Sequence, residues 1–153
     1  MKYYIIAGEA SGDLHSANLI AEIRKKDPHA EFRAWGGDLM KKQGAKLFKH
    51  YRHTAYMGFV EVAVNLRKVV GNIKECKRDL LDYHPDLVIL VDYPGFNLRI
   101  AEFAHKNHLK VCYYISPQVW AWKRRRVKKV KRSVDKMLVI LPFEEEFYKR
   151  YGV

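Results

Sequence analysis

The stretch Leu87-Val88-Ile89-Leu90-Val91 decides the fold of this 153-residue chain. It is entirely apolar and rich in β-branched side chains, which is typical of a strand buried on both faces of a parallel sheet. Pro85 precedes it and Pro94-Gly95 follows it, so the run is bounded at both ends. We therefore predict a central strand over 87–91, with other strands paired to it on both sides.

Strand and helix patterns alternate along the rest of the chain. The other predicted strands are 2–7, 31–35, 46–49, 111–115 and 137–141. The predicted helices are 14–26, 38–44, 59–83, 97–105 and 119–134. Such alternation predicts a doubly wound, mostly parallel, Rossmann-like α/β sheet in a single domain over 1–153. No helix is predicted after Pro142, and the abrupt end at 151–153 indicates a truncated chain.

Composition and charge narrow the classes of function. Lys and Arg number 29 against 17 Asp and Glu, a net charge of +12, which favours an anionic partner. Cys76 and Cys112 stand far apart, a spacing that fits neither a zinc site nor a disulfide framework. The opening apolar run at 3–7 is too short for a signal peptide, and no run reaches the roughly 20 apolar residues of a membrane span.

The loop after the first predicted strand reads Gly8-Glu9-Ala10-Ser11-Gly12-Asp13. It is neither a Walker loop nor a Gly-x-Gly-x-x-Gly turn, and its two acids would repel a pyrophosphate. Carboxylates and backbone groups suit sugar hydroxyls better. The candidate substrate-binding residues of this loop are Gly8, Glu9, Ser11, Gly12 and Asp13. The residues alone leave open a plain strand-to-helix turn with a capping Asp.

The central strand is followed by Asp92-Tyr93-Pro94-Gly95-Phe96-Asn97. In an open α/β sheet, ligands bind beyond the carboxyl ends of the strands, where these loops converge. A carboxylate at that point is placed for general base work, so Asp92 is the candidate catalytic residue and Asn97 a candidate for substrate binding. The alternative is that Asp92 caps the turn and Asn97 caps the next helix.

A third unusual segment follows the strand predicted over 111–115. Ser116, Trp120 and Trp122 offer hydrogen-bonding groups beside flat apolar rings, which suit a sugar or an acyl chain, although a core uses them too. Residues 123–132 then hold eight cations among ten residues. Val127, Val130 and Val134 form one apolar seam on this predicted helix. A solvated charged face is the simplest explanation, but such crowding of positive charge also favours a nearby anion.

The segment 59–70 carries apolar residues around nearly the whole helix circumference, close to Arg67, Lys68 and other cations. This mixture predicts a helix at an anionic membrane surface, and ordinary core packing is the alternative. The candidate residues facing the membrane or the acyl chains are Val60, Val62, Ala63, Leu66, Val69 and Val70.

Taken together, these segments resemble the lipid-A-disaccharide synthases, which are inverting glycosyltransferases of the two-domain GT-B fold. The resemblance covers the whole chain in order. Its motifs are Gly8-Glu9-Ala10-Ser11-Gly12-Asp13, Gly36-Gly37 with Met40, Met57-Gly58 with Glu61-Val62, Pro85-Asp86, Asp92/Pro94/Phe96-Asn97, Ser116-Pro117 with Val119-Trp120-Ala121-Trp122, and Leu141-Pro142-Phe143-Glu144 with Tyr148.

The resemblance implies transfer of 2,3-diacylglucosamine from UDP to 2,3-diacylglucosamine 1-phosphate, with this chain as the acceptor-binding half and the donor-binding domain absent. It implies a peripheral location on the cytoplasmic face of the inner membrane, an anionic lipid partner, and no cofactor or metal, and it is compatible with a homodimer of the full-length enzyme. The family's loop usually has a second acid where this chain has Gly95. A mechanism shared by two carboxylates is therefore not expected, whereas Asp92 remains the candidate base.

Two other classes of function remain open at this stage. A nucleic-acid-binding module would fit the basic helix, but no aromatics interleave with its cations and no familiar nucleic-acid motif is visible. Another GT-B enzyme, such as a nucleotide-sugar epimerase, would not be expected to combine Ser116-Pro117, Trp120-Ala121-Trp122 and the apolar segment 59–70.

Overall fold

The computed structural model describes residues 1–53, 66–116 and 125–153. Its centre is one six-stranded sheet in the order β3-β2-β1-β4-β5-β6, in which every neighbouring pair is parallel. The strands are β1 Lys2–Ala7, β2 Glu31–Gly36, β3 Lys46–His50, β4 Leu87–Val91, β5 Lys110–Tyr114 and β6 Lys136–Leu138. The predicted Rossmann-like α/β fold is confirmed, with the chain's first strand in the middle of the sheet.

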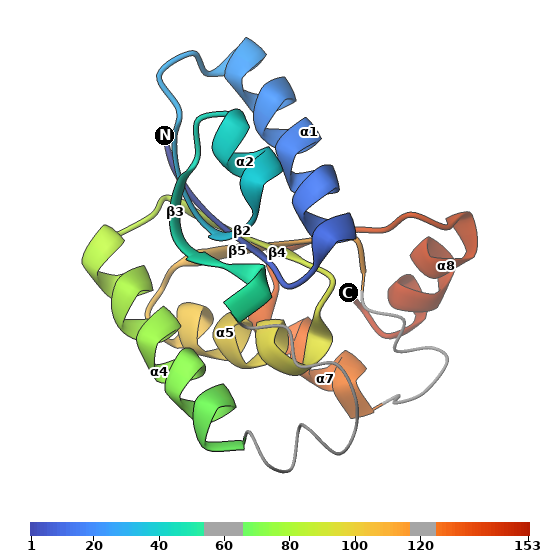
Figure 1. Cartoon of the computed structure of the whole chain (residues 1–153). Helices are drawn as coiled ribbons and strands as arrows, with labels where there is room; N and C mark the ends of the chain where they lie inside the picture. Colours follow the sequence, from blue (N-terminus) through green and yellow to red (C-terminus); the bar gives the residue numbers. More distant parts are fainter. Residues whose placement is uncertain (54–65, 117–124) are drawn as a thin grey trace.

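Helices cover both faces of this sheet (Figure 1). Two of them, α1 Ala10–Lys26 and α2 Asp38–Lys42, lie on one face. The opposite face carries α4 Leu66–Tyr83, α5 Pro94–Lys106 and α7 Arg125–Ser133. A short 3-10 turn, η1 Tyr51–His53, follows β3, and α8 Pro142–Arg150 follows β6.

Each face of the sheet has its own apolar core. On the α1 and α2 side, Ile20 and Met40 pack with Ile5 and Ile89. On the other side, the core includes the largest buried residues of α4, α5 and the neighbouring strands: Tyr4, Leu80, Leu90, Ile100 and Tyr113. β4 contributes to both cores, and residues 88–91 are at most 3% exposed. The prediction that this strand is buried on both faces is therefore confirmed.

A buried polar network ties α4 to the sheet. The Tyr4 hydroxyl donates to Asp79 Oδ2 at 2.6 Å, and Arg33 Nη2 lies 3.0 Å from Asp79 Oδ1. Tyr4 and Arg33 are paired across β1 and β2, so both reach the same carboxylate on α4. Burial raises the pKa of Asp79, whereas the hydrogen bond from Tyr4 and the charge of Arg33 oppose that shift.

Several element boundaries differ from those predicted. α1 begins at Ala10 rather than 14, and α5 begins at Pro94 rather than 97, because proline suits the first turn of a helix. β6 ends at Leu138 rather than 141. The expectation of no helix after Pro142 was wrong: α8 starts there, and Glu144 Oε2 accepts hydrogen bonds from the amides of Ile140 and Leu141.

Candidate functional site

The carboxyl ends of the parallel strands bring several predicted loops to one edge of the sheet. Ala7 at the end of β1 is paired with Val91 at the end of β4, so Glu9 and Asp92 follow neighbouring strands. β5 pairs with β4 on the other side, and its following loop begins with Ile115 and Ser116. The loops singled out from the sequence thus share one edge, where ligands bind in open α/β sheets.

Asp92 lies at this edge in an unusual backbone conformation. Its φ is 42° and that of Tyr93 is 48°, both in the left-handed region. The Asp92 carbonyl accepts hydrogen bonds from Asn97 Nδ2 at 2.9 Å and from the Tyr113 hydroxyl at 2.5 Å. Its amide donates to the Ile115 carbonyl at 3.3 Å. Contacts from α5 and from the end of β5 therefore hold the turn that presents the carboxylate.

The surroundings of Asp92 favour its protonated form. Partial burial raises the pKa of the carboxyl, and the negative charge of Glu9 raises it further. A hydrogen bond from the backbone amide of Tyr93 acts in the opposite direction. Glu9 itself is exposed and accepts a hydrogen bond from the Ser11 hydroxyl. A carboxylate with a raised pKa at a strand tip is suited to accepting a proton during a reaction.

The glycines of the first loop lie in close packing, which is tightest at Gly8. A Cβ on Gly8 would lie 2.4 Å from Cγ of the Tyr93 ring, so only glycine lets that ring cross the loop. A Cβ on Gly12 would lie 3.1 Å from the Cβ of Ala7, which brings the first turn of α1 close to β1. These two glycines therefore set how tightly the loop joins β1, α1 and the Asp92 turn.

Asp13 is buried beneath the same loop and caps a different helix. Its Oδ1 accepts from the amides of Gly37 at 2.9 Å and Met40 at 3.1 Å, and its Oδ2 accepts from the amide of Leu39 at 3.1 Å. The residue is 3% exposed. It thus joins α1 to the first turn of α2, whereas the sequence suggested capping within its own loop.

Asn97 and Ser116 are also inside the molecule. The Asn97 amide donates to the Val91 and Asp92 carbonyls, and the residue is 0% exposed. The Ser116 hydroxyl donates to Glu144 Oε1 at 2.7 Å, which links the end of β5 to α8. Trp120 and Trp122 lie outside the described residues. Among the described candidates for catalysis and substrate binding, Glu9, Ser11 and Asp92 are therefore the ones whose side chains reach the surface.

Three residues that matter at this site were not among the site residues predicted from the sequence. Tyr113 holds the Asp92 carbonyl, the Tyr93 ring crosses Gly8, and Glu144 anchors Ser116. Tyr93 stands inside a loop that was singled out, and Glu144 follows a proline, so both had a local signal. Tyr113 had none, because its role depends on the register between β4 and β5.

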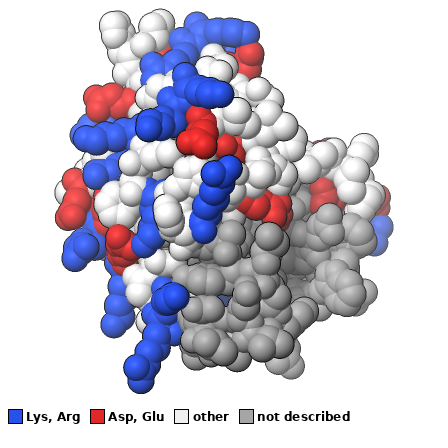
Figure 2. Space-filling view, in the orientation of Figure 1, with Lys and Arg blue, Asp and Glu red and all other residues white. Residues whose placement is uncertain are grey.

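The proposed membrane residues are only partly described. Val60, Val62 and Ala63 lie outside the described residues, and Leu66 begins α4. Val69 packs against the core, whereas Val70 is 42% exposed. Val70 lines a shallow depression with the other members of one helix face, Arg67, Gly71 and Lys74. In the view of Figure 2, Lys and Arg side chains are spread over the upper and left parts of the surface, with Asp and Glu side chains among them.

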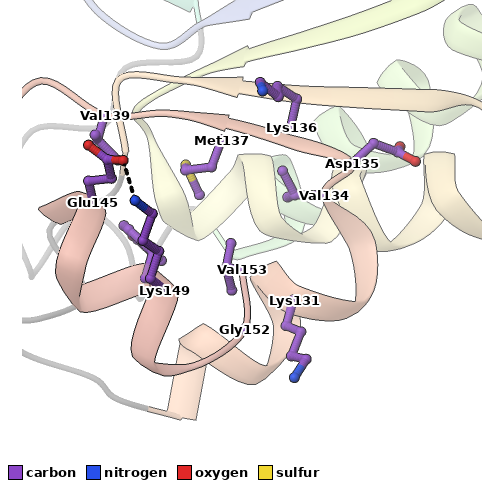
Figure 3. A pocket seen from close by; sticks show the side chains of 11 residues that line it. Lys131, Val134, Asp135, Lys136, Met137, Val139, Glu145, Lys149, Gly152 and Val153 are labelled. Atoms are coloured by element: carbon purple, nitrogen blue, oxygen red, sulfur yellow. Dashed lines mark ion pairs between the residues drawn. The ribbon is translucent and has the colours of Figure 1, made fainter.

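The basic helix α7 packs against the core through the apolar residues that the sequence predicts. Val127 and Val130 are 1% and 0% exposed, and Val134 packs beside them, so the predicted apolar seam is confirmed. One of its cations is compensated, because Lys129 forms an ion pair with Glu102 of α5 at 3.2 Å. A cavity of about 430 Å³ lies between α7, β6 and α8, with the Glu145–Lys149 ion pair at its rim (Figure 3).

The part of the chain that the structure describes contains neither a candidate metal cluster nor a candidate membrane-spanning helix. In residues 1–53, 66–116 and 125–153, no group of three or more His, Cys, Asp or Glu side chains is placed to hold a metal ion. Within the same part of the chain, none of the helices combines the length and the apolar character needed to cross a bilayer.

Solved structures of other proteins share this fold. The fold matches that of UDP-GlcNAc 2-epimerase from Neisseria meningitidis with a TM-score of 0.67 and 11% identity, over 100% of this chain and 43% of that one. It also matches the glycotransferase of kitacinnamycin with a TM-score of 0.56 and 15% identity, over 98% of this chain and 38% of that one. The strand order and these matches define a Rossmann-like domain of the GT-B type.

The sequence then gives the family. The model of the family described as lipid-A-disaccharide synthetase matches residues 3–153, so the chain belongs to this family. Lipid-A-disaccharide synthases from Trichlorobacter lovleyi and Syntrophus aciditrophicus are 47% and 46% identical to it over 149 residues. Each match covers 97% of this chain and 39% of the relative, so the chain spans about two fifths of their length.

Proposed function

We propose that the full-length protein is a lipid-A-disaccharide synthase and that this chain is its acceptor-binding domain. The reaction would transfer 2,3-diacylglucosamine from its UDP derivative to 2,3-diacylglucosamine 1-phosphate, which yields a β-1,6-linked disaccharide phosphate and UDP. The observation that carries the proposal is Asp92, a carboxylate with a raised pKa at the tip of a central strand in a chain of this family. A second, donor-binding domain is part of the proposal.

Asp92 would act as the general base. The 6-hydroxyl oxygen of the acceptor attacks the anomeric carbon of the donor, and the bond from that carbon to the UDP oxygen breaks on the opposite face. The hydroxyl proton passes to the Asp92 carboxylate, and inversion follows from the single displacement. Glu9 and Ser11 are exposed beside Asp92 and would bind hydroxyl groups of the acceptor sugar.

The remaining candidates would act through the shape of the loops. Gly8 and Gly12 permit the close packing of the first loop, and Asp13, Asn97 and Ser116 hold the chain around it. Trp120 and Trp122 are proposed to face the acceptor and its acyl chains. No cofactor is proposed, because a displacement by a hydroxyl group requires only a base and stabilisation of the departing diphosphate.

The activity can be tested directly with the full-length protein. We expect it to release UDP from UDP-2,3-diacylglucosamine only when 2,3-diacylglucosamine 1-phosphate is present, with the disaccharide phosphate as the second product. Release of UDP without disaccharide would contradict the proposed transfer. Sequence-independent binding of DNA that collapses with salt, without any transfer, would support the basic nucleic-acid-binding module instead.

The charge of Glu9 provides a prediction about pH. Asp92 must be ionised to accept a proton, so kcat/KM should fall as the pH drops through its raised pKa. Glu9→Gln removes a negative charge that raises this pKa, so the acid limb of the pH profile should move to lower pH. The position of the limb is measured rather than its height. Glu22→Gln, at an exposed acid further along α1, is the control and should leave the limb unmoved. A limb that stays in place in Glu9→Gln would refute the coupling.

A second proposal concerns an anionic membrane surface. We propose that residues 60–66 and the exposed part of α4 through Val70 rest on the cytoplasmic face of the inner membrane. The depression lined by Arg67, Val70 and Lys74 supports this, since it combines an exposed apolar side chain with two flanking cations. Each cation near an anionic surface contributes about 1 kcal/mol to binding.

Liposomes that contain phosphatidylglycerol test this surface. The double variant Arg67→Ala/Lys74→Ala should bind them roughly thirtyfold more weakly, because two such contributions are lost. The control Lys41→Ala/Lys42→Ala removes two exposed cations from α2, on the opposite face of the sheet, and should bind as the parent does. Equal weakening in both variants would show that net charge alone determines binding.

A further inference from the structure

The turn that carries Asp92 requires external support. Asp92 and Tyr93 are two consecutive residues with left-handed backbone angles, and neither is a glycine. Side chains with a Cβ adopt this conformation at an energetic cost, so surrounding contacts must hold it. The backbone angles of Asp92 set the direction of its Cα–Cβ bond, so the contacts that hold these angles also determine which positions the carboxylate can reach.

Tyr113 supplies a contact to that turn. It lies on β5 opposite Leu90 of β4, and its ring is 0% exposed in the core shared with α5. Its hydroxyl donates to the Asp92 carbonyl at 2.5 Å. The Asn97 amide donates to the same oxygen at 2.9 Å from the side of α5. Two buried donors from different elements therefore converge on one carbonyl oxygen.

We propose that Tyr113 is a positioning residue for Asp92. Its hydroxyl fixes the Asp92 carbonyl, and thereby keeps the carboxylate aimed at the acceptor hydroxyl without touching the substrate. The proposal rests on the proposed function, because it assumes that Asp92 is the base. It concerns the hydroxyl alone, since the ring would pack in the same core as phenylalanine.

The variant Tyr113→Phe in the full-length protein tests this. It removes one oxygen and keeps the ring, so we expect the melting temperature and the KM for the acceptor to change little. The kcat should fall roughly ten- to a hundredfold, as misplacement of a catalytic group by about an ångström does. Tyr4→Phe is the matched control, because Tyr4 is equally buried on β1 and donates to Asp79 rather than to the site. It should leave kcat unchanged.

A double-variant cycle separates positioning from a general loss of packing. If Tyr113 acts through Asp92, then Tyr113→Phe should cause no further loss of kcat in the Asp92→Asn background. A loss of the same size in that background, or an unchanged kcat in Tyr113→Phe alone, would overturn the positioning role. Asp92→Asn with full activity would instead overturn the assignment of the base, and Tyr113 would then have no base to position.

Discussion

Replacing Asp92 with asparagine in the full-length protein is expected to lower kcat by about 10²–10⁴-fold, the usual contribution of a general base. Asparagine keeps the size and the polar character of the side chain but cannot accept the hydroxyl proton. The Asp92 backbone contacts to Asn97, Tyr113 and Ile115 do not involve the carboxylate, so they should persist. The measurement is the rate of UDP release at saturating concentrations of both substrates.

Measurements of folding and a threshold for the rate are needed to interpret this result. The circular dichroism spectrum and melting temperature of Asp92→Asn should match those of the parent, so a lost fold would not explain the lost rate. Since the carboxylate is partly exposed and forms no ion pair among the described contacts, its removal should not destabilise the domain. A variant that kept more than about a tenth of the parent rate would show that Asp92 is not the base.

Asp13→Ala is expected to reduce the free energy of unfolding by about 3 kcal/mol. The substitution leaves the amides of Gly37, Leu39 and Met40 without their acceptor, and an unsatisfied buried donor costs about 1–3 kcal/mol. Relaxation of the short helix α2 toward water would limit the sum. The measurement is urea unfolding followed by circular dichroism.

The control for this prediction is Glu9→Ala in the same loop. Glu9 is exposed and accepts a hydrogen bond from the Ser11 hydroxyl at the surface, so its loss should change the free energy of unfolding by less than about 0.5 kcal/mol. If the two variants were equally stable, the cap on α2 would contribute nothing, and Asp13 would have to be explained by ligand binding.

The fold could be predicted because its signals are local. The apolar run 87–91 is a strand whatever its neighbours are, and it proved to be buried on both faces. The alternation of strands and helices then allows few topologies. The boundaries were harder to predict. Pro94 and Pro142 are the first residues of helices, whereas the prediction placed them in the segments that follow the strands. The spacing of apolar residues predicts that a helix is present, but it does not show at which residue the helix begins.

The sequence allowed us to predict the exposed groups of the site, but not the buried contacts that hold them. Asp92 could be placed at a strand tip because β4 was recognised. The partners of Asp13 lie 24 to 27 residues further along the chain, and no local pattern connects them. Tyr113 is similar: a tyrosine within a strand could point to either face, and its bond to Asp92 depends on how β5 aligns with β4.

The central position of β1 has a consequence for synthesis on the ribosome. β1 is made before β2 and β4, and β2 can pair with one of its sides once residues 31–36 have emerged. Its other side must wait for β4, whose residues 87–91 appear some fifty residues later in the chain than β2. Until then, the nascent chain carries an open apolar strand edge, which is prone to pairing with other chains. Translation through residues 37–86 is therefore the interval in which we expect this protein to depend most on chaperones.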